Sequence, residues 1–220
     1  MRTGLDVALE YSSSQTLTTF ATSLSHDGKA FDGDASVQFR YGESEDDQHV
    51  KFVSSRGWMA NVSLDATPDG RVSPFVLGSV EASLEKRIAS RTSGGAGAKL
   101  VLAKSNTGSA SLSLALLGER TVALSDTAVA PTTVGRWSWR AKIEQRVADR
   151  VSFVHTTFFA PAFRALAQYT VTSTSVASLA VNKALAFTLT FTDNYDSQAV
   201  SRGAPTNNDG SLLFGIRASY

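Results

Sequence analysis

The residues best suited to catalysis or metal binding are three histidines, His26, His49 and His155, which lie far apart in the chain. Zinc sites built on histidine bring their ligands together at short, regular spacings, and these three show none. Serine is abundant, but no strained Gly-x-Ser-x-Gly elbow presents one as a nucleophile. The sequence therefore predicts no metal, no cofactor and no enzymatic activity. A Ser–His pair acting on lipid is kept as an alternative.

Two further segments invite a ligand interpretation. Glu43, Glu45, Asp46 and Asp47 form an acidic loop whose carboxylates could bind a hard cation, but its spacing matches no known calcium loop. Residues 93–98 are rich in glycine, yet a phosphate cradle needs a helix directly after the glycines, and here a strand is predicted. We expect a solvated acidic loop and glycines that relieve crowding at a bend of a sheet.

A denser set of polar residues surrounds the longest predicted connection, near the end of the chain. It contains Asp193, Tyr195, Asp196, Arg202 and Asp209. These residues could gate a channel mouth or bind a solute or ion there. They could equally order the loop through Asp turns and an Arg–carboxylate pair, and this structural interpretation is favoured because it needs no ligand.

These residues are set on segments that alternate between apolar and polar side chains, as antiparallel strands do. Leu185, Phe187, Leu189 and Phe191, for example, alternate with alanine and threonine. Turn signals such as Asn-Asp-Gly separate the segments. The pattern predicts twelve strands in one domain, residues 1–220, near 5–13, 15–26, 33–43, 49–66, 72–89, 93–104, 109–122, 134–147, 150–160, 165–179, 183–195 and 210–220.

The last predicted strand indicates where the apolar faces point. Leu212, Phe214, Ile216 and Tyr220 share one face, and the chain ends on the aromatic residue. This is typical of the strand that closes a bacterial outer-membrane β-barrel, with the apolar face in lipid and the other face toward the lumen. The fold class predicted is all-β, a closed antiparallel up-and-down transmembrane barrel of about twelve strands. Leu112 and Leu114 are then expected to face lipid with Phe187 and Leu189.

In such a barrel the charged residues of the polar faces line the lumen. The candidates are Glu81, Glu85, Lys99, Glu119, Arg140, Lys142 and Glu144. Aromatic residues gather near the ends of the predicted strands, as the two interfacial girdles of a membrane barrel require. An even number of strands puts both termini on the periplasmic side, and the connections on that side are predicted to be the shorter set.

Composition excludes several other classes of protein. The 220 residues carry 21 Lys and Arg against 20 Asp and Glu, so nucleic-acid binding is not expected. There is no cysteine, which excludes disulfides and thiolate chemistry. No apolar run reaches the roughly 18 residues of a membrane helix, which is compatible with a barrel. The first residues lack a signal-peptide core, so we expect a mature or trimmed chain.

Three stretches resemble a known family. Residues 71–99 (RVSPFVLGSVEASLEKRIASRTSGGAGAK) resemble a central segment of the salt-induced outer-membrane proteins, domain of unknown function 481. Residues 111–121 (SLSLALLGERT) are similar to its next strand, and 190–197 (TFTDNYDS) with 208–220 are similar to its ending. The resemblance implies a barrel in the bacterial outer membrane and no established biochemical activity.

The functional expectation is accordingly modest. The chain is expected to be a monomeric barrel whose partners are outer-membrane lipid and, through the C-terminal strand, the barrel-assembly machinery. It would serve as an envelope-stress component or as a narrow passive pore, with lumen charges setting ion preference. A soluble β-sandwich or open barrel that binds a ligand or partner is the alternative from another class.

Overall fold

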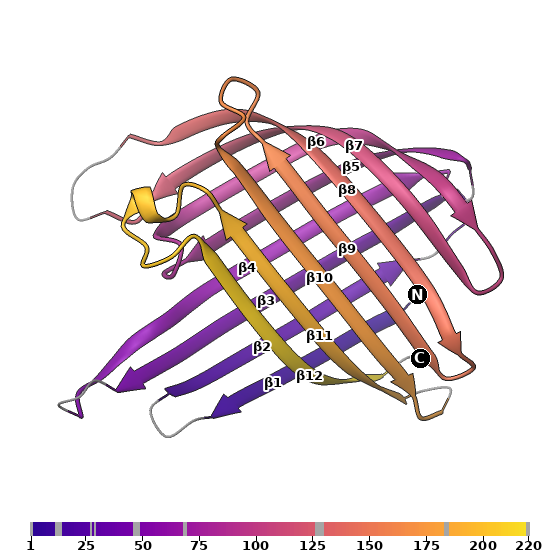
Figure 1. Cartoon of the computed structure of the whole chain (residues 1–220), viewed down its shortest axis with the longest axis horizontal. Coiled ribbons are helices and arrows are strands. Elements are labelled where there is room, and N and C mark those ends of the chain that lie inside the picture. Colours follow the sequence, from indigo (N-terminus) through magenta and orange to yellow (C-terminus); the bar gives the residue numbers. More distant parts are fainter. Residues whose placement is uncertain are drawn as a thin grey trace.

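The computed structural model describes residues 2–11, 15–26, 28, 30–45, 49–67, 70–125, 130–182 and 185–218. Twelve strands and one short 3-10 helix make up these residues (Figure 1). The strands are β1 (Arg2–Tyr11), β2 (Gln15–His26), β3 (Phe31–Glu45), β4 (Lys51–Ala66), β5 (Val72–Ser83), β6 (Ile88–Lys104), β7 (Gly108–Ala123), β8 (Thr132–Ala148), β9 (Val151–Pro161), β10 (Tyr169–Ala180), β11 (Leu185–Asp196) and β12 (Asn208–Ala218). The helix, η1 (Val200–Arg202), lies between β11 and β12.

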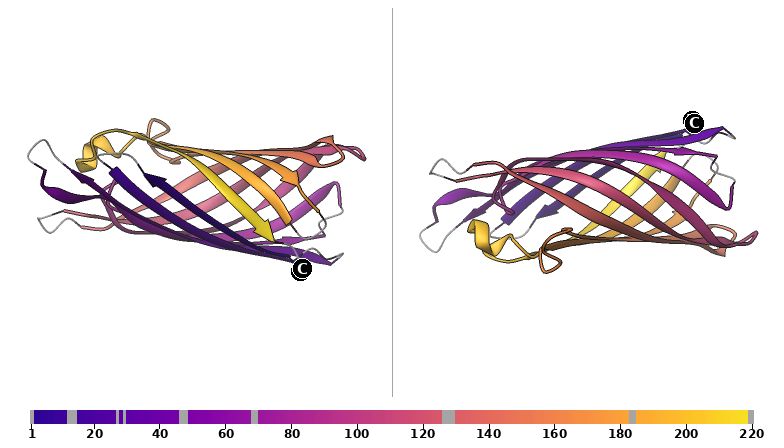
Figure 2. Two further views of the ribbon diagram at one scale, coloured as in Figure 1. Left: turned by 90° about the horizontal axis from the view of Figure 1, so that it is seen from below. Right: turned by 90° about the horizontal axis from the view of Figure 1, so that it is seen from above.

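The strands form one antiparallel sheet in which each pairs with the next along the chain, in the order β1 to β12. The sheet curls, so β1 also contacts β12. Figure 2 shows the tilted strands wrapping around a common axis, with η1 and the longer connections at the end away from the marked C-terminus. We call the η1 end the mouth and the other end the base. The number of strands is even, and the connections at the base are the shorter set, as the sequence predicts.

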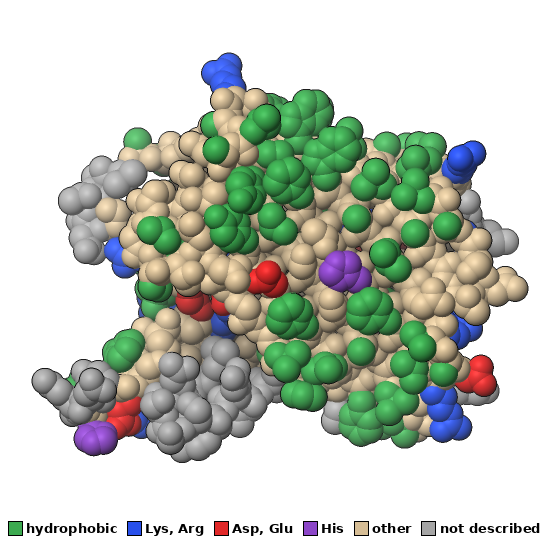
Figure 3. All heavy atoms as spheres, viewed as in Figure 1, with side chains coloured by type: hydrophobic (Ala, Val, Ile, Leu, Met, Phe, Trp, Pro, Cys, Tyr) green, Lys and Arg blue, Asp and Glu red, His purple; other side chains and the backbone are tan. Residues whose placement is uncertain are grey.

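The two faces of the sheet reverse the pattern of a soluble protein. Leu112, Leu114, Phe187 and Leu189 are 37%, 37%, 50% and 36% exposed on the outer face. Their inward neighbour Ser113 is only 2% exposed. Hydrophobic side chains cover much of the outer wall over β8 to β12 (Figure 3). Because exposed apolar bands of this extent are stable only against lipid or a partner, the prediction of outward-pointing apolar residues is confirmed.

Aromatic residues on the outer wall cluster as the sequence predicts. Near the mouth, the rings of Phe159 and Tyr169 lie 5.6 Å apart, and those of Tyr169 and Tyr195 lie 5.4 Å apart. Such a belt suits the depth of lipid headgroups. Two residues from the predicted set of girdle aromatics differ: Phe75 and Phe158 point inward, where both rings lie against the Arg140 guanidinium.

One strand boundary differs clearly from the prediction. The strand expected over 72–89 ends at Ser83, and a turn at 84–87 leads into β6 at Ile88. The turn contains no glycine, proline or asparagine, so no local signal marks it. A hydrogen bond stabilises the turn instead, because the Ser83 hydroxyl accepts one from the Lys86 N–H at 3.1 Å. Arg87 adopts a positive φ of 53° in this turn.

The earlier start of β6 changes the position of the glycine-rich segment. β6 starts at Ile88 rather than at 93, so residues 93–98 lie in the middle of the strand and not at its start. A Cβ atom at Gly95 or Gly97 would lie 2.0 or 2.2 Å from the Leu116 or Leu114 carbonyl oxygen of β7. The glycines therefore permit a close approach of two backbones, which fits the predicted structural role.

No helix among the described residues is long and apolar enough to cross a membrane.

Candidate functional site: the charged inner wall

The inner wall near the mouth is built around Arg91, which β6 points into the barrel. Its Nη1 donates to Glu81 Oε1 at 3.0 Å, and its Nη2 donates to Asp196 Oδ2 at 2.8 Å. Glu81 is on the adjacent β5, but Asp196 ends β11, which is not a neighbour of β6 in the sheet. The Arg91–Asp196 pair therefore crosses the interior from one wall to another.

The connection between β11 and β12 is fastened to the same carboxylate. Arg202, at the end of η1, donates from Nη2 to Asp196 Oδ2 at 2.6 Å and from Nε to the Lys86 carbonyl oxygen at 3.2 Å. Lys86 in turn places its Nζ 3.4 Å from Glu81 Oε2. The long mouth connection is thus tied to the β5–β6 turn, which lies on a distant part of the sheet.

A second arginine extends this set of contacts along the wall. Arg136 donates from Nη2 to Glu119 Oε1 at 2.9 Å, and both side chains are buried. Its Nη1 donates to the carbonyl oxygens of Ala160 and Gln168 at 3.0 and 3.1 Å. Buried charges need such multiple partners, because desolvation is costly. We name Arg91, Glu81, Asp196, Arg202, Glu119 and Arg136 the mouth network.

Arg40 of β3 forms a separate bridge beside the mouth network. Its Nη1 lies 2.9 Å from Asp209 Oδ2 of β12 and 3.8 Å from Glu85 Oε1. Glu85 also accepts hydrogen bonds from the hydroxyls of Ser83, at 3.0 Å, and Ser55. Cations and carboxylates are therefore matched around this end, leaving little net charge to select ions by sign.

Toward the base, each ion pair joins residues on the same strand or on strands close to each other in the sheet. Lys99 Nζ lies 2.5 Å from Asp65 Oδ2, and Lys142 Nζ lies 2.6 Å from Glu144 Oε1 on the same strand. The second pair is also half-exposed. Ser109 donates to Glu144 at 3.1 Å. These contacts stay on one stretch of wall and leave the interior uncrossed.

Between the two ends, the inner wall carries one centrally held cation and a cavity that Arg40 also lines. Arg140 lies 5.2 Å from the Phe75 ring centroid and 5.8 Å from that of Phe158, and it donates to the Ser113 hydroxyl at 3.3 Å. A cavity of about 230 Å³ separates β2–β4 from β10–β12. Seven of the residues that line it carry hydroxyl groups: Thr19, Thr172, Thr174, Thr188, Thr190, Thr192 and Ser211. Such a wall can hydrate an ion or a small polar solute without binding it tightly.

The structure divides the polar set predicted around the longest connection. Asp196, Arg202 and Asp209 meet partners inside, as described above. Tyr195 instead stacks on Tyr169 on the outer wall, and strand alternation puts Asp193 on the same outer face. Only the first three can act on the lumen. Asp193 and Tyr195 lie at the mouth end of β11 but do not join the other three inside the sheet.

Two important cations were not among the sequence candidates. Arg91 lies where the sequence predicted a connection, so its inward direction depended on the missed turn at 84–87. Arg136 falls on the polar face of β8, four residues before the predicted candidate Arg140. That alternation was a usable signal. The candidates Glu81, Glu85, Lys99, Glu119, Arg140, Lys142 and Glu144 all take part in inner-wall contacts.

The histidines stay apart. His155 lies on the outer face of β9, where its Nδ1 is 2.8 Å from the Ser175 hydroxyl and its Nε2 is 2.9 Å from that of Thr157. His49 contacts Glu45, whereas Glu43 accepts a hydrogen bond from Tyr41. Within the described residues, no three His, Asp or Glu side chains are grouped as metal ligands. Asp46 and Asp47 lie outside the described residues.

The C-terminal strand has the predicted orientation where its side chains are described. Leu212 and Phe214 are exposed on the outer wall, Phe214 to 70%. Ile216 belongs to β12 and pairs with Phe187 of β11. Tyr220 lies outside the described residues.

The structure is an all-β, barrel-like fold: one antiparallel up-and-down sheet that curls until its first and last strands meet around a charged inner wall. The chain belongs to the family of proteins of unknown function DUF481, whose model matches residues 12–220. No curated protein matches the sequence. The NanC porin structure is similar with a TM-score of 0.60 at 8% identity, over 100% of both chains. The translocator domain of the autotransporter NalP from Neisseria meningitidis is similar with a TM-score of 0.52 at 11% identity, over 100% of this chain and 86% of that one. At such identities the likeness concerns the fold alone.

Proposed function

We propose that this protein is a bacterial outer-membrane barrel that lets ions or small polar solutes pass through a narrow lumen, and that the mouth network constricts the passage. The observation that carries the proposal is the reversed burial: apolar side chains cover the outer wall, while threonine, serine and paired charges line the interior. A soluble sandwich would bury the apolar faces against each other instead.

Closure of the barrel is part of this proposal. β1 lies against β12 at the seam, and hydrogen bonds between them would leave no open edge in lipid. With an even number of strands, both termini lie at the base, which we assign to the periplasm, and the mouth is extracellular. Outer-membrane lipid and the barrel-assembly machinery, acting on the C-terminal strand, are the proposed partners of a monomer. A role in envelope stress stays a prediction.

Passage through this barrel would be passive. The wall offers hydroxyl groups and balanced charges, so a solute keeps most of its hydration and meets no deep binding site. The tightest region is the mouth, where the Arg91–Asp196 pair crosses the interior and Arg202 holds the long connection over it. Conduction then depends on how firmly these ion pairs are closed.

Single-channel conductance in planar bilayers tests this function. We expect small steps in the wild type and a changed cation-to-anion preference in Glu81→Lys and Arg140→Glu, because both side chains line the passage. A neutral outer-wall substitution, Leu114→Val, is the matched control and should conduct as the wild type does. Absence of conductance in the wild type and in every mouth variant would reject the pore and leave a scaffold.

A lipid-acting hydrolase is the second candidate, since Ser175 and His155 are hydrogen-bonded on the lipid-facing wall. Ser175 would be the nucleophile and His155 the base. We nevertheless propose that the protein is not an enzyme. His155 lies between Phe153 and Phe159 on β9, and Ser175 pairs with it on β10, so both are away from the headgroup belt where ester bonds lie. Release of fatty acid from phospholipid vesicles that is lost in Ser175→Ala would reverse this choice.

A further inference from the structure

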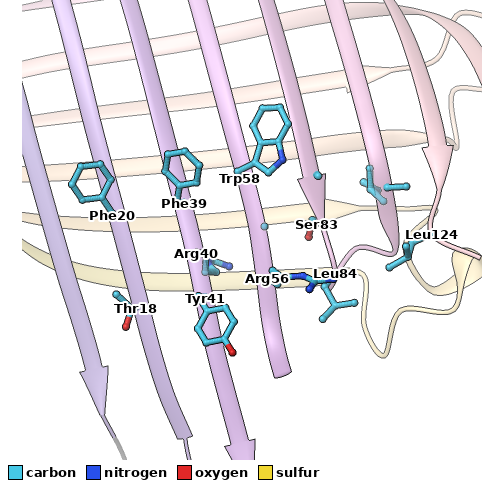
Figure 4. Close-up of a pocket in the computed structure, with 14 residues that line it drawn as sticks. Thr18, Phe20, Phe39, Arg40, Tyr41, Arg56, Trp58, Ser83, Leu84 and Leu124 are labelled. Carbon is cyan, nitrogen blue, oxygen red and sulfur yellow. The ribbon is translucent and has the colours of Figure 1, made fainter. Parts of the chain in front are cut away.

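A groove on the outer wall lies at the mouth end of β2 to β7 and measures about 470 Å³ (Figure 4). It arises because β5 ends early at Ser83, whereas β3 and β4 continue beyond that level. Leu84 and Leu124, which follow the ends of β5 and β7, form one side of the groove. This volume lies in the range of small-molecule sites.

The floor of the groove is a row of three aromatic rings. Phe20 pairs with Phe39, and Phe39 pairs with Trp58, on three neighbouring strands. All three are exposed, and Figure 4 shows them side by side. Rigid, flat surfaces of this kind suit an extended hydrocarbon chain, which gains contact along its whole length.

Polar groups lie beside this row, on its mouth side. Tyr41 and Arg56 are adjacent on β3 and β4, beyond Phe39 and Trp58 (Figure 4). Arg56 is exposed and has no ion-pair partner among the described residues, whereas Arg40 behind it is paired with Asp209. The nearby carboxylate, Glu43, is engaged by the Tyr41 hydroxyl at 2.8 Å. A guanidinium that no described carboxylate pairs with, above an apolar groove, is complementary to an acyl chain with a phosphate at its head.

The depth of the groove agrees with this ligand. Phe31 and Tyr41 are the first and last aromatic residues on the outward face of β3, and strand rise with a barrel tilt separates them by roughly 24 Å along the membrane normal. This is the height of the apolar band of an outer-membrane barrel, so Tyr41 and Arg56 lie at the outer headgroup level.

We propose that this groove binds one acyl chain of a phosphorylated lipid of the outer leaflet, with the chain along Phe20, Phe39 and Trp58 and the phosphate on Arg56. The chemistry is shared by lipid A and by anionic glycerophospholipids. The groove lies on the membrane-facing wall and not in the lumen. Loss of lipid binding would therefore leave conduction intact, and loss of conduction would leave lipid binding intact.

Trp58 makes the site measurable. In a Trp137→Phe, Trp139→Phe background, Trp58 is the single fluorophore, and brominated acyl chains quench it on contact. In lipid nanodiscs we expect brominated phosphatidylglycerol to quench Trp58 more than brominated phosphatidylcholine does. Arg56→Gln should lower that preference about threefold, the effect of one partly exposed charge-assisted contact. Arg120→Gln, an exposed arginine of β7 outside the groove, is the matched control and should keep it.

Competition identifies the source of the lipid. Relief of quenching by unlabelled lipid A, at a lower fraction than by phosphatidylglycerol, assigns the site to lipid A; the opposite order assigns it to a glycerophospholipid. Equal quenching by the two brominated lipids, or an equal loss in Arg120→Gln, overturns the proposal. If the background does not fold, native mass spectrometry decides: wild-type barrels retain a phosphorylated lipid that Arg56→Gln barrels lose, and equal retention overturns it.

Discussion

The two ends of the inner wall use the same residue types in different ways. At the mouth, Arg91 of β6 joins Asp196 of β11, and Arg202 ties the last long connection to the same carboxylate. At the base, Lys99 and Asp65 lie two strands apart, and Lys142 and Glu144 share one strand. The ion pairs at the mouth span the interior, whereas those at the base lie along one stretch of the inner wall. Ion pairs therefore cross the interior only where the curl of the sheet brings distant strands together.

The largest effect is expected from Asp196→Asn. This change leaves Arg91 and Arg202 close together without their shared carboxylate, and loss of one partner from a buried pair costs about 3–5 kcal/mol. The free energy of unfolding in detergent micelles should fall by that order, and conductance should rise several-fold as the mouth connection loosens. An unchanged conductance with lowered stability would mean that the network is structural only.

Asp65→Asn probes the matching position at the base. Because its pair with Lys99 does not cross the interior, we expect a loss of stability of about 1–3 kcal/mol and little change in conductance. The comparison is made on the same two measurements as for Asp196→Asn. An equal gain in conductance from both variants would contradict the distinction between the two ends.

Arg140→Gln tests the cation held between the two ends. Two aromatic rings and a serine hydroxyl hold the guanidinium, and cation–π contacts contribute about 0.5–2 kcal/mol. We expect a stability loss in that range and a shift of ion preference toward cations, measured as the reversal potential across a salt gradient. Arg140→Lys, which keeps the charge, should restore the preference but not all of the stability.

A substitution on the outer wall is expected to change the stability in the opposite direction. Replacing His155 by Leu removes a polar group from a surface that we place in lipid, so stability should stay the same or rise by about 1–2 kcal/mol. Heat-modifiable gel mobility measures this directly. A loss of stability would instead indicate that a protein partner covers His155 and Ser175.

Lys142→Ala should have the smallest effect. Its ion pair with Glu144 is half-exposed, and such pairs contribute about 0–1 kcal/mol. Both unfolding and conductance should match the wild type within error. A larger effect would show that the base is narrower and drier than its exposure suggests.

Much of the fold could be predicted from the sequence, and the errors have local causes. Strands such as β4 and β7 were predicted to within a few residues, because their alternation is long and strong turn signals bound them. The β5–β6 turn was missed because its stabilising contacts come from Ser83 and from the backbone of distant Arg56, not from turn residues. That error also hid Arg91. Among the mouth candidates, the alternation of β11 already separates Asp193 from Asp196, but proximity in sequence obscured it.

The sequence by itself determined the period of two, the outward direction of Leu112 and Phe187, and the inward direction of Glu81 and Glu119, because side-chain direction in a strand is a local property of the backbone. Only the tertiary structure decided which inward charges meet. Arg91 and Asp196 are brought together by the curl of the whole sheet, and no local rule of pairing relates two residues on strands that are not neighbours.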